Sequence, residues 1–144
     1  MMHRTALAAI ALLLGGPALA QGVAWVSSEK DNALTLIDMG KMAVIGTVPT
    51  CKRPRHISLL PDGKRLLTAC ADSHQGDLID IVSRKSVGKL PLGDDPEAFD
   101  LSPDGKQLYV SSEEEGELLV LDAATGRKIK AIKVGEEPEG VLAS

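Results

Sequence analysis

The sequence predicts an all-β chain, a β-propeller segment of about three four-stranded antiparallel blades that form a partial ring. The first observation is a 42-residue repeat, because Pro61-Asp62-Gly63-Lys64 returns as Pro103-Asp104-Gly105-Lys106. The second is that each period contains four short apolar segments separated by turn residues, without a helical pattern of comparable length. Four antiparallel strands in a repeat of about 40 to 45 residues are typical of a propeller blade.

The first twenty residues have the pattern of a secretory signal peptide. His3 and Arg4 precede an apolar run over residues 6–14, and Ala18-Leu19-Ala20 supplies the small residues of a cleavage site. A run of about nine residues is too short to cross a hydrocarbon core ~30 Å thick. We therefore expect cleavage after Ala20, a secreted, periplasmic protein that begins at Gln21, and no membrane insertion after cleavage.

The repeat divides the remaining chain into blades. Residues 21–54 form a first blade that lacks its first strand, 55–96 a second, 97–138 a third, and 139–144 the start of a fourth. In the second blade we expect strands over 56–60 and 65–70, a polar loop over 71–76, a third strand that includes 78–80, and a fourth over 87–92. In the third blade we expect strands over 99–102, 107–112, 118–122 and 128–134.

Four segments of the repeat have a distinctive pattern, namely Trp25-Val26-Ser27-Ser28, Tyr109-Val110-Ser111-Ser112, Ser102-Pro103-Asp104-Gly105 and Val134-Gly135-Glu136-Glu137-Pro138. This blade pattern resembles the YVTN-type β-propeller repeat. More narrowly, Arg53-Pro54-Arg55, Cys70-Ala71-Asp72-Ser73 and Gly93-Asp94-Asp95-Pro96-Glu97, with the signal peptide, are similar to the PQQ-dependent catabolism-associated β-propeller proteins. This resemblance implies a secreted seven-bladed propeller beside pyrroloquinoline quinone (PQQ) alcohol-oxidation systems, with no catalytic residues to carry over.

The chain is shorter than seven blades require. Seven periods would need about 294 residues, whereas the 124 residues after Ala20 amount to three periods less two residues. We expect a truncated longer propeller, or alternatively several copies that assemble into one ring. An open arc would expose apolar blade faces and favour self-association. A truncated product without a function stays a third alternative.

Charge and composition favour a protein partner over nucleic acid. The net charge of −4 and the three aromatic residues offer neither a basic surface nor stacking platforms. Strand alternation places the proline-containing connectors and the loops after each second strand on one face. This face could dock a periplasmic dehydrogenase or a c-type cytochrome, or it could simply be solvated. The candidate docking residues are Lys52, Arg53, Arg55, His56, Asp94, Asp95, Glu97, Glu136, Glu137 and Glu139.

The remaining candidate residues have structural explanations. Asp38, Asp80 and Asp122 recur every 42 residues at the start of a turn, which predicts Asx-turns rather than a metal site. His56 could ligate a metal or haem, but it has no second ligand at a suitable spacing. Cys51 and Cys70 fall near one another across the hairpin centred on Asp62, so they form either a disulfide or two free thiols.

These observations together predict a non-catalytic binding or docking protein with no evident cofactor. The sequence contains no covalent-haem, zinc, phosphate-loop or Gly-x-Ser-x-Gly motif. The alternative is part of a propeller enzyme or of a haem- or metal-binding propeller. In that case Arg55, Glu97 and Glu139, which occupy equivalent positions, would supply part of a site at the central channel.

Overall fold

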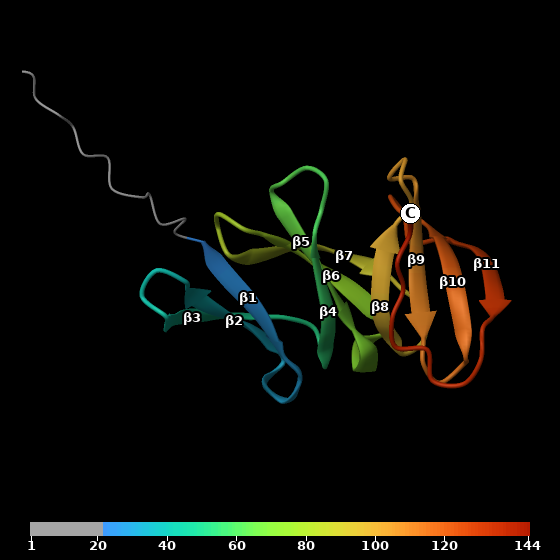
Figure 1. Cartoon of the computed structure of the whole chain (residues 1–144), viewed down its shortest axis with the longest axis horizontal. Coiled ribbons are helices and arrows are strands. Elements are labelled where there is room, and N and C mark those ends of the chain that lie inside the picture. The colour runs from blue at the N-terminus through green and yellow to red at the C-terminus, as the bar shows by residue number, and fades with distance from the viewer. Residues whose placement is uncertain (1–21) are drawn as a thin grey trace, which may run out of the picture.

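The computed structural model describes residues 22–144, and the predicted signal peptide lies outside them. Three antiparallel sheets stand side by side in an arc that does not close (Figure 1). This arrangement confirms the predicted fold class, a partial β-propeller. The first sheet contains β1 (Val23–Ser28), β2 (Ala33–Asp38) and β3 (Ala43–Pro49). The second contains β4 (Pro54–Leu59), β5 (Arg65–Cys70), β6 (Gln75–Asp80) and β7 (Lys85–Pro91), and the third β8 (Pro96–Leu101), β9 (Gln107–Ser112), β10 (Glu117–Asp122) and β11 (Lys128–Lys133).

The Pro-Asp-Gly segments form the turns between the first two strands of the second and third sheets. Gly63 and Gly105 adopt φ angles of +65° and +70°, a region that glycine enters without steric cost. The Asp62 carboxylate accepts a hydrogen bond from the backbone N–H of Lys64 at 2.8 Å. These interactions fix the position at which β4 turns back into β5.

The aspartates at the ends of β2, β6 and β10 also close turns. Asp38 accepts backbone N–H bonds from Gly40 and Lys41, each at 2.9 Å. Asp80 and Asp122 accept the corresponding bonds from Ser83 and Thr125, at 2.6 and 2.9 Å. Each carboxylate therefore satisfies the backbone of its own turn, as an Asx-turn does.

The polar loop expected over residues 71–76 is shorter in the structure. A 3-10 helix, η2 (Ala71–Ser73), is followed by β6, which already begins at Gln75. His74 adopts a left-handed conformation with φ of +52°, and its N–H donates to the carbonyl of Ala71 at 3.1 Å. The chain therefore reverses within one tight turn. The equivalent helix in the first sheet is η1 (Glu29–Asp31).

The core consists of two apolar layers, one at each junction between neighbouring sheets. Between the second and third sheets, Leu67 and Leu92 pack with Phe99 and Leu108. Between the first and second sheets, buried aliphatic side chains form a smaller cluster. Its members are Leu34, Leu36, Val48, Leu66 and Ile79. Because neighbouring residues of a strand point to opposite faces, Leu66 and Leu67 place β5 in both layers.

Some apolar side chains on the first and last sheets remain exposed. Val26 on β1 and Val44 on β3 are 45% and 64% exposed, and Ile129 on β11 is 48% exposed. Such surface is consistent with the expected self-association of an open arc, which stays a prediction. Within residues 22–144, no helix has the length and apolar character needed to cross a membrane.

Candidate functional site

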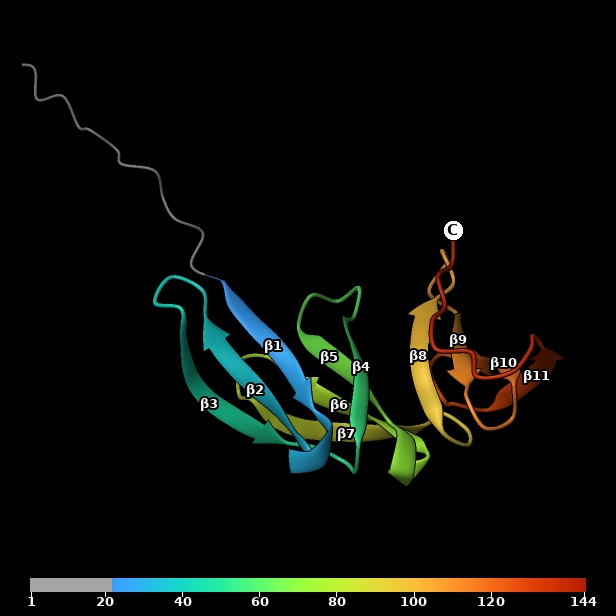
Figure 2. The same cartoon turned by 60° about the horizontal axis from the view of Figure 1, so that its bottom comes forward.

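The candidate site lies at one edge of the arc, where loops from all three sheets meet. Figure 1 shows η1, η2 and the β9–β10 loop at the lower edge, opposite the Pro-Asp-Gly turns. β1, β4 and β8, each the first strand of its sheet along the chain, stand next to one another, and Figure 2 shows the same order in a second view. Residues that are far apart in the sequence can therefore meet across the sheet junctions.

Backbone hydrogen bonds anchor the connectors that precede β4 and β8. The N–H of Ala71 donates to the Arg53 carbonyl at 3.0 Å, and the N–H of Glu113 donates to the Asp95 carbonyl at 3.2 Å. Arg53, Asp95 and Glu137 occupy equivalent places in the repeat and have positive φ angles of +57°, +40° and +48°. The same sharp bend thus presents the side chains of each connector at the loop edge.

Arg53 is the first centre of an ion-pair network. Its guanidinium lies 3.6 Å from a Glu29 carboxylate oxygen, 3.5 Å from one of Asp72 and 3.7 Å from one of Asp95. Burial would lower the pKa of Arg53, but the carboxylates of Asp95 and Asp72 outweigh it and raise the pKa above its usual value. Arg53 therefore stays charged and joins all three sheets.

Arg55 on β4 is the second centre. One of its terminal nitrogens lies 3.2 Å from Glu29, and the other contacts Glu97 directly. Glu113 lies farther away, with 4.0 Å between its carboxylate oxygen and Arg55 Nη2. The hydroxyl of Ser27 donates to the Arg55 carbonyl at 2.8 Å, so β1 holds the backbone of β4 at this point.

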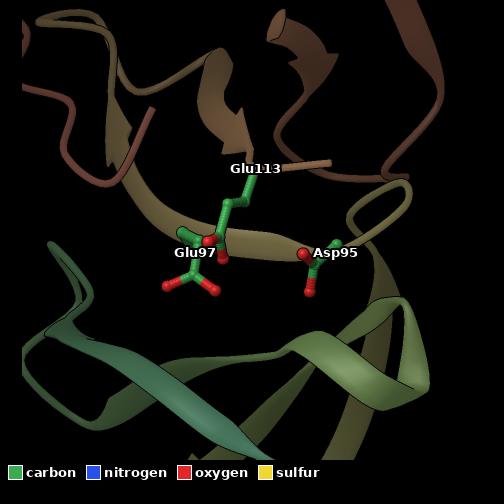
Figure 3. Close-up of side chains that lie close together, drawn as sticks. All are labelled: Asp95, Glu97 and Glu113. Carbon is green, nitrogen blue, oxygen red and sulfur yellow. The ribbon is translucent and has the colours of Figure 1, made fainter. Parts of the chain in front are cut away.

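Glu97 on β8 is the most unusual carboxyl group of the site. Its side chain is only 4% exposed, and its Oε1 has no hydrogen-bond partner. Burial raises the pKa of Glu97 to about 7, the neighbouring Glu113 carboxyl adds to the rise, and Arg55 opposes it. Figure 3 shows the Glu113 carboxyl group directed toward that of Glu97, with the Asp95 carboxyl group to one side.

An acidic cleft of about 680 Å³ opens beside this group. Its lining includes six acidic residues and two basic residues, Arg53 and Lys133. The acidic residues are Asp95, Glu113, Glu114, Glu115, Glu136 and Glu137. Lys133 is itself paired, with its Nζ 3.1 Å from Glu117 Oε1. Because both basic residues already have acidic partners, the cleft presents negative charge.

The structure distributes the predicted docking residues over distinct environments. Asp95 and Glu97 are buried, with whole-residue exposures of 8% and 5%. They pair with Arg53 of the connector before β4 and with Arg55 of β4. Lys52, Asp94 and Glu139 are exposed outside the ion-pair network, and Glu136 and Glu137 line the cleft. Among the basic docking candidates, Arg53 and Arg55 are thus paired with neighbouring carboxylates, whereas Lys52 is exposed.

His56 packs into the molecule. Its ring meets Phe99 edge-on, with 4.7 Å between the ring centroids. Burial lowers the pKa of His56, while the Asp100 carboxylate opposes this shift. A neutral imidazole against an aromatic ring is a packing arrangement.

A disulfide joins Cys51 and Cys70, whose Cα atoms are 5.8 Å apart. Cys51 lies in the connector between the first and second sheets, and Cys70 is the last residue of β5. The bridge therefore ties the connector that carries Arg53 to the strand that precedes η2. It helps to hold the basic centre of the network against Asp72.

The sequence analysis named Asp95 and Glu97 as candidate docking residues, but it did not single out Glu29 and did not predict that Asp95, Glu97 and Glu113 meet. The repeat contains a signal for Glu29, because Glu29 and Glu113 lie 84 residues apart, which is two periods. The repeat contains no signal that Asp95, Glu97 and Glu113 meet, because their meeting depends on how deeply each side chain is buried.

Comparisons with known proteins support the fold. No protein-family model matches the chain, and no curated protein matches it. Among solved structures, it is similar to Kuenenia stuttgartiensis hydrazine synthase at 25% identity and a TM-score of 0.68, over 81% of this chain and 34% of that one. It is also similar to dihydro-haem d1 dehydrogenase NirN in complex with DHE, at 22% identity and a TM-score of 0.60, over 81% and 26% of the two chains.

A third similar structure is a protein of unknown function from Bacteroides caccae, at 16% identity and a TM-score of 0.65. That alignment covers 80% of this chain and 47% of the other. These neighbours are propeller-like proteins, and this chain spans less than half the length of each.

Proposed function

We propose that the chain is a non-catalytic docking segment of a secreted, periplasmic propeller whose acidic cleft receives a basic protein partner. The observation that carries the proposal is the composition of the cleft, six acidic residues against two basic residues that are themselves paired. Complementary charge raises association rates and orients the partner. The disulfide and the predicted signal peptide support an oxidising compartment.

The resemblance to YVTN-type and PQQ-associated propellers narrows the class of partner. It favours a protein of PQQ-dependent alcohol oxidation, namely a periplasmic dehydrogenase or a c-type cytochrome. A cytochrome with a basic surface around its haem edge has the charge that this cleft would attract. The specific probe is therefore a purified basic c-type cytochrome.

Binding to this cytochrome should depend on ionic strength. Exposed charges are screened beyond about 8 Å at 0.15 M salt, so affinity should fall as salt rises. Substituting Glu114→Gln, Glu115→Gln and Glu136→Gln together should weaken binding roughly tenfold, if each exposed charge contributes about 0.5 kcal/mol. Titration calorimetry in EDTA-containing buffer measures both effects.

Matched single variants test whether the cleft itself is responsible. Glu136→Gln removes one charge from the cleft, and Asp31→Asn removes one exposed charge from η1 on the first sheet. We expect only the former to weaken binding. Equal effects of the two variants, or an affinity that is indifferent to salt, would contradict a docking role for the cleft.

The second candidate function is a haem- or metal-binding propeller, or part of a propeller enzyme. It is favoured by the names of two structural neighbours, a hydrazine synthase and a dihydro-haem d1 dehydrogenase. Purified protein should then retain a visible haem absorption or a bound metal. A colourless, metal-free protein that still binds the cytochrome would favour docking.

A further inference from the structure

A compact group of three carboxylates lies beneath the acidic cleft. Asp95 belongs to the connector before β8, Glu97 to β8, and Glu113 follows the last residue of β9. One carboxylate oxygen from each residue lies within 4.8 Å of the other two. Figure 3 shows Asp95 and Glu97 projecting from one segment of the chain and Glu113 approaching them from another.

The unpartnered oxygen of Glu97 distinguishes this group from an ordinary acidic surface. The Glu97 side chain is 4% exposed, and its Oε1 accepts no hydrogen bond, while Oε2 contacts Arg55. A buried acceptor without a partner is costly, so native proteins rarely keep one. A positively charged ligand between the carboxylates would satisfy this oxygen.

The two arginines satisfy the three carboxylates only in part. The distances from the guanidinium nitrogens to Asp95 and Glu113 are 3.7 and 4.0 Å, which exceed hydrogen-bond range. Arg53 and Arg55 also face Glu29 and Asp72, so five carboxylates surround two guanidinium groups. When all five carboxyl groups are ionised, three negative charges remain unbalanced, and a divalent cation would reduce this excess to one.

The donor atoms and their spacing select the kind of ion. Carboxylate oxygens suit hard cations, whereas zinc sites favour nitrogen and sulfur ligands. Ca²⁺ binds oxygens at 2.3–2.6 Å, so two of its ligands can lie up to about 5 Å apart, which accommodates oxygens that all lie within 4.8 Å of one another. Mg²⁺ requires a smaller, near-octahedral shell. Water from the cleft would complete the coordination of Ca²⁺.

We propose that Asp95, Glu97 and Glu113 form a Ca²⁺ site at the loop edge of the third sheet. Asp95 and Glu113 also line the cleft, but the docking experiment changes only the exposed residues Glu114, Glu115 and Glu136, which lie outside the Ca²⁺ site, and it is performed in EDTA. Failure of one proposal therefore does not decide the other. The ion would link the connector before β8 to the β9–β10 loop.

Titration of the EDTA-stripped full chain with CaCl₂ tests the site. Isothermal titration calorimetry should detect one ion per chain with a Kd of about 10⁻⁴ to 10⁻³ M, the range of extracellular calcium modules. Asp95→Asn and Glu97→Gln should each weaken binding at least tenfold. Asp31→Asn, an exposed carboxylate outside the group, is the control matched to Asp95→Asn and should bind as the unaltered chain does.

Two further measurements keep the test decisive. Thermal unfolding should shift to a higher temperature with CaCl₂ and much less with the same concentration of MgCl₂. Circular dichroism checks that each variant folds, and Glu113→Gln replaces any variant that does not. The absence of Ca²⁺ binding up to 10 mM, equal effects of Mg²⁺, or unchanged binding by Glu97→Gln and Asp95→Asn would overturn the proposal.

Discussion

Opening the disulfide between Cys51 and Cys70 should remove a large part of the stability of the second sheet. The two cysteines are 19 residues apart in the sequence. In the chain-entropy model, a loop of this length corresponds to about 3 kcal/mol of stabilisation at 25 °C. Small domains have only 5–15 kcal/mol of total stability, so this loss is large.

Urea unfolding with and without reductant measures this contribution. Reduction of the unaltered chain should lower the free energy of unfolding by about 3 kcal/mol. The double variant Cys51→Ala, Cys70→Ala should show similar stability in both conditions. Both cysteines are buried, with exposures of 7% and 0%, so alanine also removes packing, and the variant should be somewhat less stable than the reduced chain.

Thiol titration under unfolding conditions is the control, since it establishes that the reductant has opened the bridge. Superimposable unfolding curves for the oxidised and fully reduced chains would refute the reasoning. They would mean that the connector and β5 remain in place through packing and ion pairs alone.

Three further predictions concern the core, a turn and acid stability. Leu108→Ala removes a side chain that is 1% exposed and should cost about 2–5 kcal/mol in urea unfolding, whereas Leu142→Ala, at 87% exposure, should change stability by less than about 0.5 kcal/mol. Gly126→Ala would place a Cβ 2.5 Å from the Pro91 carbonyl oxygen, so it should destabilise the chain more than Gly63→Ala, where nothing lies within 4 Å of the added Cβ. Equal losses of stability in urea unfolding would show that only the positive φ angle matters. Hydrogen bonds, chiefly from the Ser102 hydroxyl and also from the Lys106 N–H, lower the pKa of Asp104 in the folded chain below 3.8. Its contribution to stability should therefore be present above pH 3.8 and disappear as the pH falls through the pKa of the folded chain. Asp104→Asn should therefore flatten the acid limb of a stability–pH curve, and an unchanged acid limb would contradict this assignment.

The repeat made the fold predictable because turn residues recur at fixed intervals. Where the repeat tolerates different residues, the sequence is less informative. The left-handed turn after each third strand contains Met42, Arg84 and Gly126 at equivalent positions, with φ angles of +49°, +56° and +70°. Only the glycine signals the conformation by its chemistry. His74 also adopts a left-handed conformation that its residue type does not indicate. The loop predicted over residues 71–76 is therefore longer than the turn in the structure.

The loop edge was predictable from strand alternation, but its electrostatics were not. Arg55 and Glu97 occupy equivalent positions in the repeat, which predicts that both side chains are similarly exposed on the same face. The structure instead brings them into contact across the junction between the second and third sheets. A linear repeat pattern does not describe this contact, because the side chains reach sideways into the next blade. Glu97 is buried because it makes this contact with Arg55 of the neighbouring sheet.

The alternation of Leu66 and Leu67 has a consequence for the way the chain opens. The second sheet packs on both faces, whereas within the described residues the first and third sheets each pack against one neighbour. The stability of such an array is approximately the sum of the stability of each sheet and of the interfaces between adjacent sheets. Local opening should therefore start at the outer sheets, which have one interface each, and move inward. Backbone amides of β5 and β6 should consequently exchange with deuterium last, and those of β3 and β11 first.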